Sequence, residues 1–243
     1  MRLAIISDVH GNLVALEAVL DDIQARGVDA IVNLGDCVTS PLWPRETFEL
    51  LAAIDMPTVR GNNDRSLTDT PLADMPRSTR FTYDSLTEPQ REALRALPPF
   101  VELQGDILAV HGTPSSDKKY LLHDKVDGRL ALACGAAVAS RLDGVEAGLI
   151  LCGHSHAQHV ALSNERVVIN PGSVGCPRYA DDDDWHVAEV GSPHARFAIA
   201  TQRGKGWSVE LIALEYDWAP VVEQARVNGR ADWAAGFLGQ WPS

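Results

Sequence analysis

The chain opens with a pattern of apolar and polar positions that is typical of a strand–helix–strand unit. Residues 3–6 are apolar and predict a short buried strand. Apolar residues then recur every three or four positions behind a candidate N-cap, Asn12, which predicts a helix that ends at Gly27. Residues 30–33 predict a second strand. Two strands joined by a helix imply a parallel pair, so we expect an α/β protein.

The same patterning predicts the remaining elements and a single domain. Further strands are expected at residues 56–59, 100–103, 106–110, 149–152, 160–162, 167–169, 185–190, 195–201 and 207–214, the last three being antiparallel. Further helices are expected at residues 45–54, 88–97, 128–142 and 218–237. The composition shifts to Thr, Asp, Pro and Arg from Ser66 to Gln90, which we interpret as an irregular surface excursion or lid spanning about 66–90. No linker or repeat divides the chain, so we expect one domain over residues 1–243 with a helical tail at about 216–243.

Polar side chains that can bind metal ions follow several of the predicted strands. They are Asp8, His10, Asp36, Asn62, His111, His154 and His156. Ligands of parallel sheets collect beyond the carboxyl ends of the strands, where these residues lie. His154 and His156 stand at i and i+2, so on an extended chain both imidazoles would point to the same side. The sequence therefore predicts that these seven side chains meet.

This set of side chains suits two metal ions better than one. A tetrahedral ion takes four ligands, fewer than the two carboxylates, one amide and four imidazoles present here. Imidazole and carboxylate ligands without thiolate are compatible with Mn, Fe, Zn or Ni. Two ions about 3.5–4 Å apart can clamp a phosphoryl group and supply a bridging hydroxide at neutral pH. Two divalent ions outweigh two carboxylates in charge, so the pocket would attract a phosphate.

Five motifs together resemble the signature of the calcineurin-like metallophosphoesterases, and most closely that of the small bacterial phosphodiesterases. In chain order they are Asp8-x-His10, Gly35-Asp36, Gly61-Asn62-Asn63-Asp64, His111 and Gly153-His154-Ser155-His156. The resemblance implies a four-layer α-β-β-α sandwich and hydrolysis of phosphate esters, most of all phosphodiesters. It also implies that Asp8, His10 and His156 hold one metal ion, that Asn62, His111 and His154 hold the second, and that Asp36 is shared.

One position departs from the family pattern. Many members carry a histidine after the metal-binding asparagine, and that histidine is assigned the leaving-group proton; this chain has Asn63. An amide can bond a phosphate oxygen but cannot deliver a proton at neutral pH. We therefore assign catalytic roles to Asp36, Asn62, Asn63 and His111. We assign substrate binding to Asn63 and Arg178. For Arg178, the alternative of a solvated arginine on a surface loop stays equally open.

Several other residues have both a functional and a structural interpretation. His123 could replace the proton donor if its loop reaches the site. Asp64 is expected to support a neighbouring ligand through a hydrogen bond. Arg60 is interpreted as a salt-bridge partner, Arg77 and Arg80 as surface charge, and His159, His186 and His194 as structural. Trp233, Phe237 and Trp241 recur every four residues, which favours core packing over an oligomer contact, although an oligomer stays possible.

Composition and charge narrow the classes of partner. The net charge of −12 disfavours binding to a nucleic-acid duplex or to an anionic membrane surface. The four cysteines show no CxxC spacing, so we interpret them as the reduced thiols of a cytoplasmic protein. We expect neither a signal peptide nor a membrane span, since no apolar run approaches the roughly 20 residues that a bilayer requires.

Two rival functions stay open at the sequence level. The enzymatic rival is a phosphomonoesterase, including a protein phosphatase. The rival from another class is a non-catalytic metal-binding scaffold of the same fold. A scaffold would be expected to have lost ligands, whereas all seven are present here.

Overall fold

The opening strand–helix–strand unit builds the first sheet of the computed structural model, which describes residues 1–104, 106–181 and 186–240. In spatial order its strands are β13 (Gly206–Leu214), β12 (Ala195–Arg203), β1 (Arg2–Ile6) and β2 (Ala30–Asn33). β1 and β2 are parallel, and α1 (Leu13–Arg26) crosses between them. The Asn12 side chain caps α1 by accepting a hydrogen bond from the Ala15 amide at 3.1 Å, as predicted.

A second sheet uses the predicted strands of the middle of the chain. In spatial order it contains β3 (Phe100–Leu103), β4 (Ile107–Val110), β7 (Leu149–Leu151), β9 (Arg166–Asn170) and β8 (His159–Ser163). β4, β7 and β9 are parallel, and β3 and β8 close the two edges as antiparallel strands. The carboxyl ends of β4 and β7 therefore lie side by side.

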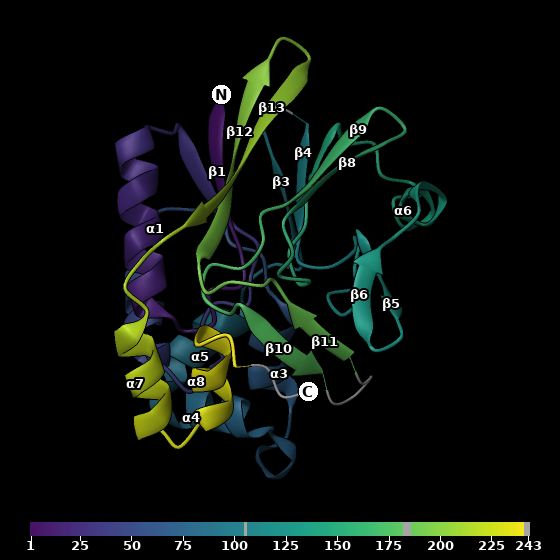
Figure 1. Ribbon diagram of the computed structural model, residues 1–243. Helices are drawn as coiled ribbons and strands as arrows, with labels where there is room; N and C mark the ends of the chain where they lie inside the picture. The colour runs from purple at the N-terminus through teal and green to yellow at the C-terminus, as the bar shows by residue number, and fades with distance from the viewer. Residues whose placement is uncertain (105, 182–185, 241–243) are drawn as a thin grey trace.

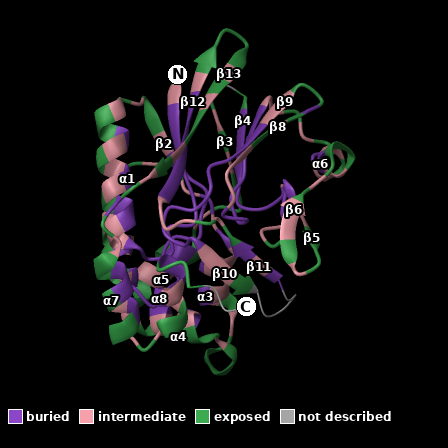
Figure 2. Cartoon of the chain, in the orientation of Figure 1, coloured by how far each residue is buried: buried purple, intermediate pink, exposed green. Residues whose placement is uncertain are grey.

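The two sheets pack face to face and carry helices on their outer faces (Figure 1). Apolar side chains from both sheets, such as Ile5, Val32 and Leu151, fill the space between them and are fully buried (Figure 2). The outer face of the first sheet packs against α1, α2 (Pro44–Ala52), α7 (Ala219–Val227) and α8 (Ala231–Phe237). The outer face of the second sheet packs against α6 (Gly135–Arg141). The predicted four-layer α-β-β-α sandwich is confirmed.

A third, smaller sheet replaces much of a predicted helix. Its strands in spatial order are β10 (Arg178–Asp181), β11 (His186–Glu189), β6 (Arg129–Leu132) and β5 (His123–Val126). The helix predicted for residues 128–142 is therefore wrong in its first half. Asp127 and Gly128 both have positive φ and form the tight turn of a hairpin, an Asp-Gly signal that periodicity alone overlooks. Trp185, the first residue of another predicted strand, lies outside the described residues, and that strand begins at His186.

The segment that we interpreted as irregular is helical. It contains α3 (Asn62–Asp69), the short 3-10 helix η1 (Leu72–Asp74), α4 (Arg77–Ser85) and α5 (Glu88–Arg95). The helix predicted at residues 88–97 is confirmed as α5, whereas α3, η1 and α4 were not predicted, because each is short and most side chains of α4 are polar. The strand predicted at residues 56–59 is also wrong, because only Thr58 forms an isolated parallel bridge, with Asn33.

The helical tail is confirmed as α7 and α8, and the chain passes from β13 directly into it. Trp233 and Phe237 pack in the core cluster of the first sheet, as favoured by their spacing, while Trp241 lies outside the described residues. Within the described part of the chain, no helix is both long and apolar enough to span a membrane. Figure 1 shows that α3, α4, α8 and the third sheet gather at the end of the molecule where β1 terminates.

Candidate metal centre

The structure brings all seven predicted ligand residues to this end of the two sheets. Six of them form two buried groups, and within each group the candidate ligand atoms lie within 4.8 Å of one another. The first group contains Asp8, His10 and His156, and the second contains Asp36, His111 and His154. Asn62, at the first position of α3, joins the second group through its Oδ1 atom, 3.0 Å from His111 Nε2. Four separate strand ends thus supply one site.

Hydrogen bonds fix which atoms of the first group face one another. The Nδ1 atoms of His10 and His156 lie 3.0 and 2.7 Å from the carbonyl oxygens of Thr39 and Cys176. A carbonyl only accepts, so each Nδ1 carries the proton and each neutral ring presents a lone pair at Nε2. These two Nε2 atoms are 3.2 Å apart, and His156 Nε2 is 3.2 Å from Asp8 Oδ1.

Three electron-pair donors therefore converge without a hydrogen between them. Asp8 Oδ1 is fully buried and finds no hydrogen-bond donor among the described residues. Such an arrangement is unfavourable unless a cation or a proton lies between the atoms. In the metal-free protein a proton fills this role: burial of His156 opposes its charge, but the Asp8 carboxylate more than offsets this and raises the pKa of His156 well above its usual value. The donor set fits a divalent cation.

The Asp36 carboxylate lies between the two groups. Its Oδ2 atom is 3.7 Å from His10 Nε2 in the first group and 3.5 Å from His111 Nε2 in the second. His111 is oriented like the first two histidines, with Nδ1 2.8 Å from the Leu34 carbonyl oxygen. His154 is turned the other way: its Nε2 lies 3.2 Å from the Lys118 carbonyl oxygen, which leaves Nδ1 as the atom able to bind a cation. One carboxylate can thus serve both groups.

The pKa values of the second group reflect this arrangement. Burial disfavours the charged form of His111, but the neighbouring Asp36 carboxylate outweighs burial and raises the His111 pKa to about 9. Burial, followed by the positive charge of His111, lowers the His154 pKa to about 4. At neutral pH the metal-free protein therefore holds a charged His111 beside a neutral His154.

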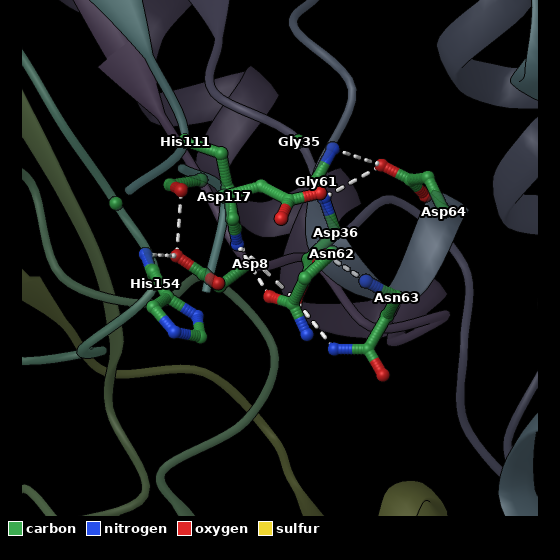
Figure 3. Close-up of polar contacts among 12 residues, drawn as sticks. Asp8, Gly35, Asp36, Gly61, Asn62, Asn63, Asp64, His111, Asp117 and His154 are labelled. Atoms are coloured by element: carbon green, nitrogen blue, oxygen red, sulfur yellow. Dashed lines mark hydrogen bonds and ion pairs between the residues drawn. The ribbon is translucent and has the colours of Figure 1, made fainter. Parts of the chain in front are cut away.

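Buried polar groups hold the ligand backbone in place (Figure 3). Asp64 accepts hydrogen bonds from the amides of Asp36, Cys37 and Gly61 at 2.8, 3.0 and 2.9 Å, which confirms the expected supporting role of Asp64. Burial and the nearby Asp36 charge raise the Asp64 pKa to about 6. On the other side of the site, Asp8 Oδ2 accepts from the His154 amide at 3.1 Å.

Most of the candidate ligands have a left-handed backbone conformation. Five of the seven have positive φ angles between 46° and 67°: Asp8, His10, Asp36, His154 and His156. A residue other than glycine costs roughly 1–3 kcal/mol in this region, so such residues persist only where surrounding contacts impose them. The assumption of an extended chain at His154 and His156 is therefore wrong, and these two histidines serve different groups.

Glycines beside the ligands allow close approach of the chain segments. A Cβ atom on Gly153 would lie 2.1 Å from Ser7 Oγ, and one on Gly61 would lie 2.1 Å from Asp36 Oδ1. Real Cβ atoms do not approach so closely, so any larger residue would displace a segment that carries a ligand. Close packing against neighbouring segments, and not turn geometry alone, therefore requires glycine at positions 61 and 153.

A cavity of about 1230 Å³ opens over the site. It is lined by both Asn63 and Arg178, the two residues predicted to bind substrate. The described lining residues include seven of the 21 basic side chains of the protein but only four of its 33 carboxylates. The basic residues are Arg77, Lys118, Lys119, Lys125, Arg141, Arg178 and Arg230, and the carboxylates are Asp36, Asp74, Asp124 and Asp232. An acidic protein thus carries a locally basic cavity.

Several residues occupy places that the sequence did not predict. Asn63 donates from its backbone amide and its side chain to the two oxygens of Asp36, at 2.8 and 2.6 Å. His123 lines the cavity, but burial and then the neighbouring His159 lower its pKa to about 4, so it is neutral at neutral pH. Arg60 bonds the Arg95 carbonyl instead of forming the expected salt bridge in the described part of the chain.

The cavity wall contains further residues that sequence reasoning missed. Trp233 of α8 lines it, with its ring centroid 6.5 Å from that of His10. Arg77 of α4, interpreted as surface charge, also lines it and donates to the Gly229 carbonyl at 3.1 Å, whereas Arg80 pairs with Asp84. Only the spacing of Trp233 and Phe237 was visible in the sequence, and it does not reveal that α8 folds back over the site.

The fold and the site define a class of protein: an α/β sandwich with two buried His/Asp metal-binding groups at the strand ends. The chain belongs to the calcineurin-like phosphoesterase superfamily, whose domain model matches residues 1–192. This match confirms the predicted family and identifies the protein as a metallophosphoesterase. β12, β13, α7 and α8 lie beyond the matched residues.

The similarity to several other proteins extends over nearly the whole chain. The crystal structure of a metallophosphoesterase from Sphaerobacter thermophilus is 30% identical, covers 99% of both chains and superposes with a TM-score of 0.76. A hypothetical protein from Pyrococcus horikoshii OT3 shares the fold, with 19% identity, a TM-score of 0.75 and coverage of 99% of this chain and 97% of the other. An uncharacterized protein from Methanocaldococcus jannaschii is 28% identical over 98% of each chain. The similarity to these proteins therefore extends beyond residue 192 into the C-terminal part of the chain.

Proposed function

We propose that this protein hydrolyses phosphodiesters at a dinuclear metal centre. In this proposal Asp8, His10 and His156 hold one ion, Asn62, His111 and His154 hold the second, and Asp36 is shared between them. The observation that carries the proposal is the position of Asp36 Oδ2, within 3.7 Å of a histidine nitrogen from each group. When bound, the two cations supply charge for the phosphoryl oxygens and make hydroxide available at neutral pH.

The residues around the ligands favour an anionic substrate. The cavity wall has seven basic side chains against four carboxylates, two of which pair with Arg141 and Arg230, so the wall is positive in a protein of net charge −12. A positive cleft raises the local concentration of phosphate esters and speeds their association. The role proposed for Arg178, which lies on the cavity wall, is to bind a phosphoryl oxygen.

One feature favours an activated leaving group, and a second supports a diester over a monoester. Asn63 stands where a histidine donor is found in many relatives, and its amide is engaged with Asp36 and has no acidic proton to give. Reactions with leaving groups that need no protonation, such as aryl oxides, suffer least from this loss. In addition, a cavity of about 1230 Å³ offers room for substituents on both sides of a phosphoryl group.

A non-catalytic scaffold is disfavoured by the geometry of the site. All seven candidate ligands are retained, and their nitrogen and oxygen atoms face one another in the interior. A scaffold has no need to bury three mutually repelling electron-pair donors.

The test compares two substrates that share one leaving group. Wild-type protein is loaded in turn with Mn, Fe, Zn or Ni, its metal content is measured, and the hydrolysis of bis(p-nitrophenyl) phosphate is compared with that of p-nitrophenyl phosphate. We expect about two metal ions per chain and a kcat/KM for the diester at least about tenfold higher, or about 1.4 kcal/mol in the barrier. A preference for the monoester would assign a phosphomonoesterase. A metal-loaded protein that hydrolyses neither ester would refute the proposal.

A further inference from the structure

Two tyrosines that no sequence motif singled out lie against the histidines of the metal centre. The ring of Tyr120 stacks on His154, with centroids 4.5 Å apart and planes inclined by 23°. The ring of Tyr179 packs on His156 at a centroid distance of 4.5 Å. Tyr179 belongs to β10 and Tyr120 precedes β5, so both come from the region of the third sheet. Each tyrosine thus covers a histidine from a different metal-binding group.

Their hydroxyl groups form one chain of hydrogen bonds with a fixed direction. Tyr179 Oη lies 3.1 Å from the His154 carbonyl oxygen and 2.6 Å from Tyr120 Oη, which is in turn 2.6 Å from His186 Nε2. Because the carbonyl can only accept, Tyr179 donates its single proton there. Tyr120 must then donate to Tyr179, and His186 Nε2–H must donate to Tyr120.

This direction leaves neither hydroxyl with a proton for a substrate. The chain of bonds therefore does not supply the leaving-group proton that Asn63 cannot give. Its end point is instead the peptide of His154, a residue with φ of 67°. The amide of His154 is held by Asp8 Oδ2 at 3.1 Å, and its carbonyl is held by Tyr179. Both sides of a left-handed ligand residue are thus fixed by partners from distant parts of the chain.

We propose that Tyr179, supported by Tyr120 and His186, is a positioning residue that holds His154 in its ligand conformation and thereby increases metal affinity. The inference rests on the proposed dinuclear function. It links the third sheet to the metal centre, because His186 lies on β11, Tyr179 lies on β10, and both are far in sequence from the ligand loop.

The test removes one oxygen atom and measures metal binding without any substrate. Tyr179→Phe keeps the ring on His156 and deletes the bond to His154. The matched control is Tyr216→Phe, which deletes another buried hydroxyl group. This hydroxyl accepts a hydrogen bond from the Asn12 side chain at 3.1 Å, and no described contact joins it to the side chain of a candidate ligand. Titration calorimetry with Mn²⁺ and Zn²⁺ on metal-free protein should show a loss of about 10–100-fold in affinity for Tyr179→Phe. Tyr216→Phe should stay near wild type.

Each outcome bears on the inference. Equal affinity of Tyr179→Phe and wild type would overturn it, while the failure of wild type to bind any metal would instead overturn the proposed function. If Tyr179→Phe does not fold, Tyr120→Phe provides the same test with a smaller expected loss, since Tyr179 still bonds His154. Nitrogen-detected NMR of metal-free wild type gives an independent measurement. His186 should carry a proton at Nε2. An Nε2 atom without a proton would contradict the proposed donor-to-acceptor direction of the hydrogen bonds.

Discussion

Asp36→Asn is the substitution that distinguishes a shared carboxylate from two independent metal sites. The change keeps the shape of the side chain and removes one negative charge. Asp36 Oδ2 lies within 3.7 Å of a histidine nitrogen from each group, so both groups lose the same charge. By contrast, Asp8 belongs to the first group alone, and Asp8→Asn should weaken one ion and spare the other.

The magnitude follows from the contacts that the carboxylate makes. Its two oxygens accept from the Asn63 amide and the Asn63 side chain at 2.8 and 2.6 Å, so either orientation of an asparagine turns an NH₂ group toward a donor. An unsatisfied buried polar group costs about 1–3 kcal/mol, and neutralising one partner of the buried pair with His111 costs about 3–5 kcal/mol in the metal-free protein. Loss of a supporting hydrogen bond alone lowers metal affinity about 10–100-fold, so removal of a shared ligand should cost at least about 100-fold at each ion.

The assay is metal analysis after dialysis, combined with calorimetric titration of the metal-free proteins. We expect about two ions for wild type, about one for Asp8→Asn and none retained by Asp36→Asn. Asp22→Asn serves as the control for loss of one carboxylate, because Asp22 pairs with Arg26 on α1, an outer helix. If Asp36→Asn retained one tightly bound ion, the shared-carboxylate geometry would be wrong.

Two further predictions follow from the same site. The pKa of His111 is about 9 in the folded protein and 6.5 in the unfolded chain. The pairing of His111 with Asp36 therefore stabilises the metal-free protein by roughly 3 kcal/mol below about pH 6.5. This stabilisation is lost as the pH rises through about 9. Urea unfolding of metal-free protein at both ends of this range should show the loss, and Asp36→Asn should show a smaller one, because only the pairing of His156 with Asp8 then contributes. Asn63→His should restore a proton donor and raise kcat on diesters with alkyl leaving groups, by up to about 10²-fold, with little change on aryl diesters. An equal gain on both substrates, or no gain in a folded and metal-loaded variant, would contradict the assigned role of position 63.

The central part of the fold could be predicted because it rests on short apolar runs with strong periodicity. The strands that end before Asp8, His111 and Gly153 are buried on both faces and read as continuous apolar segments. In an α/β sheet the carboxyl ends of parallel strands meet, so the convergence of the polar residues behind them follows from topology. The position of the site was therefore accessible from the sequence.

The surroundings of the site could not be predicted because they rely on weaker local signals. The polar helix α4 is held by contacts with distant segments, such as the bond from Arg77 to Gly229. The β5–β6 hairpin depends on a two-residue turn, and a search for helical periodicity passes over it. α4 and β5 both line the cavity, so the sequence indicates the class of reaction more clearly than it indicates the substrate.

The left-handed ligands explain why the motif residues are not sufficient by themselves. Asp8, His10 and Asp36 adopt the left-handed conformation, which costs free energy in a residue other than glycine, and backbone bonds between two strand ends hold them there. The amides of Asp8 and His10 donate to the carbonyls of Gly35 and Asp36 at 2.9 and 3.0 Å, so each motif imposes the conformation of the other. A single motif grafted onto another loop would lose these partners and relax to negative φ, which would turn its ligand atoms away. The ligand geometry is therefore a property of the packed pair of strands, which is why several motifs in order carry far more information than any one of them.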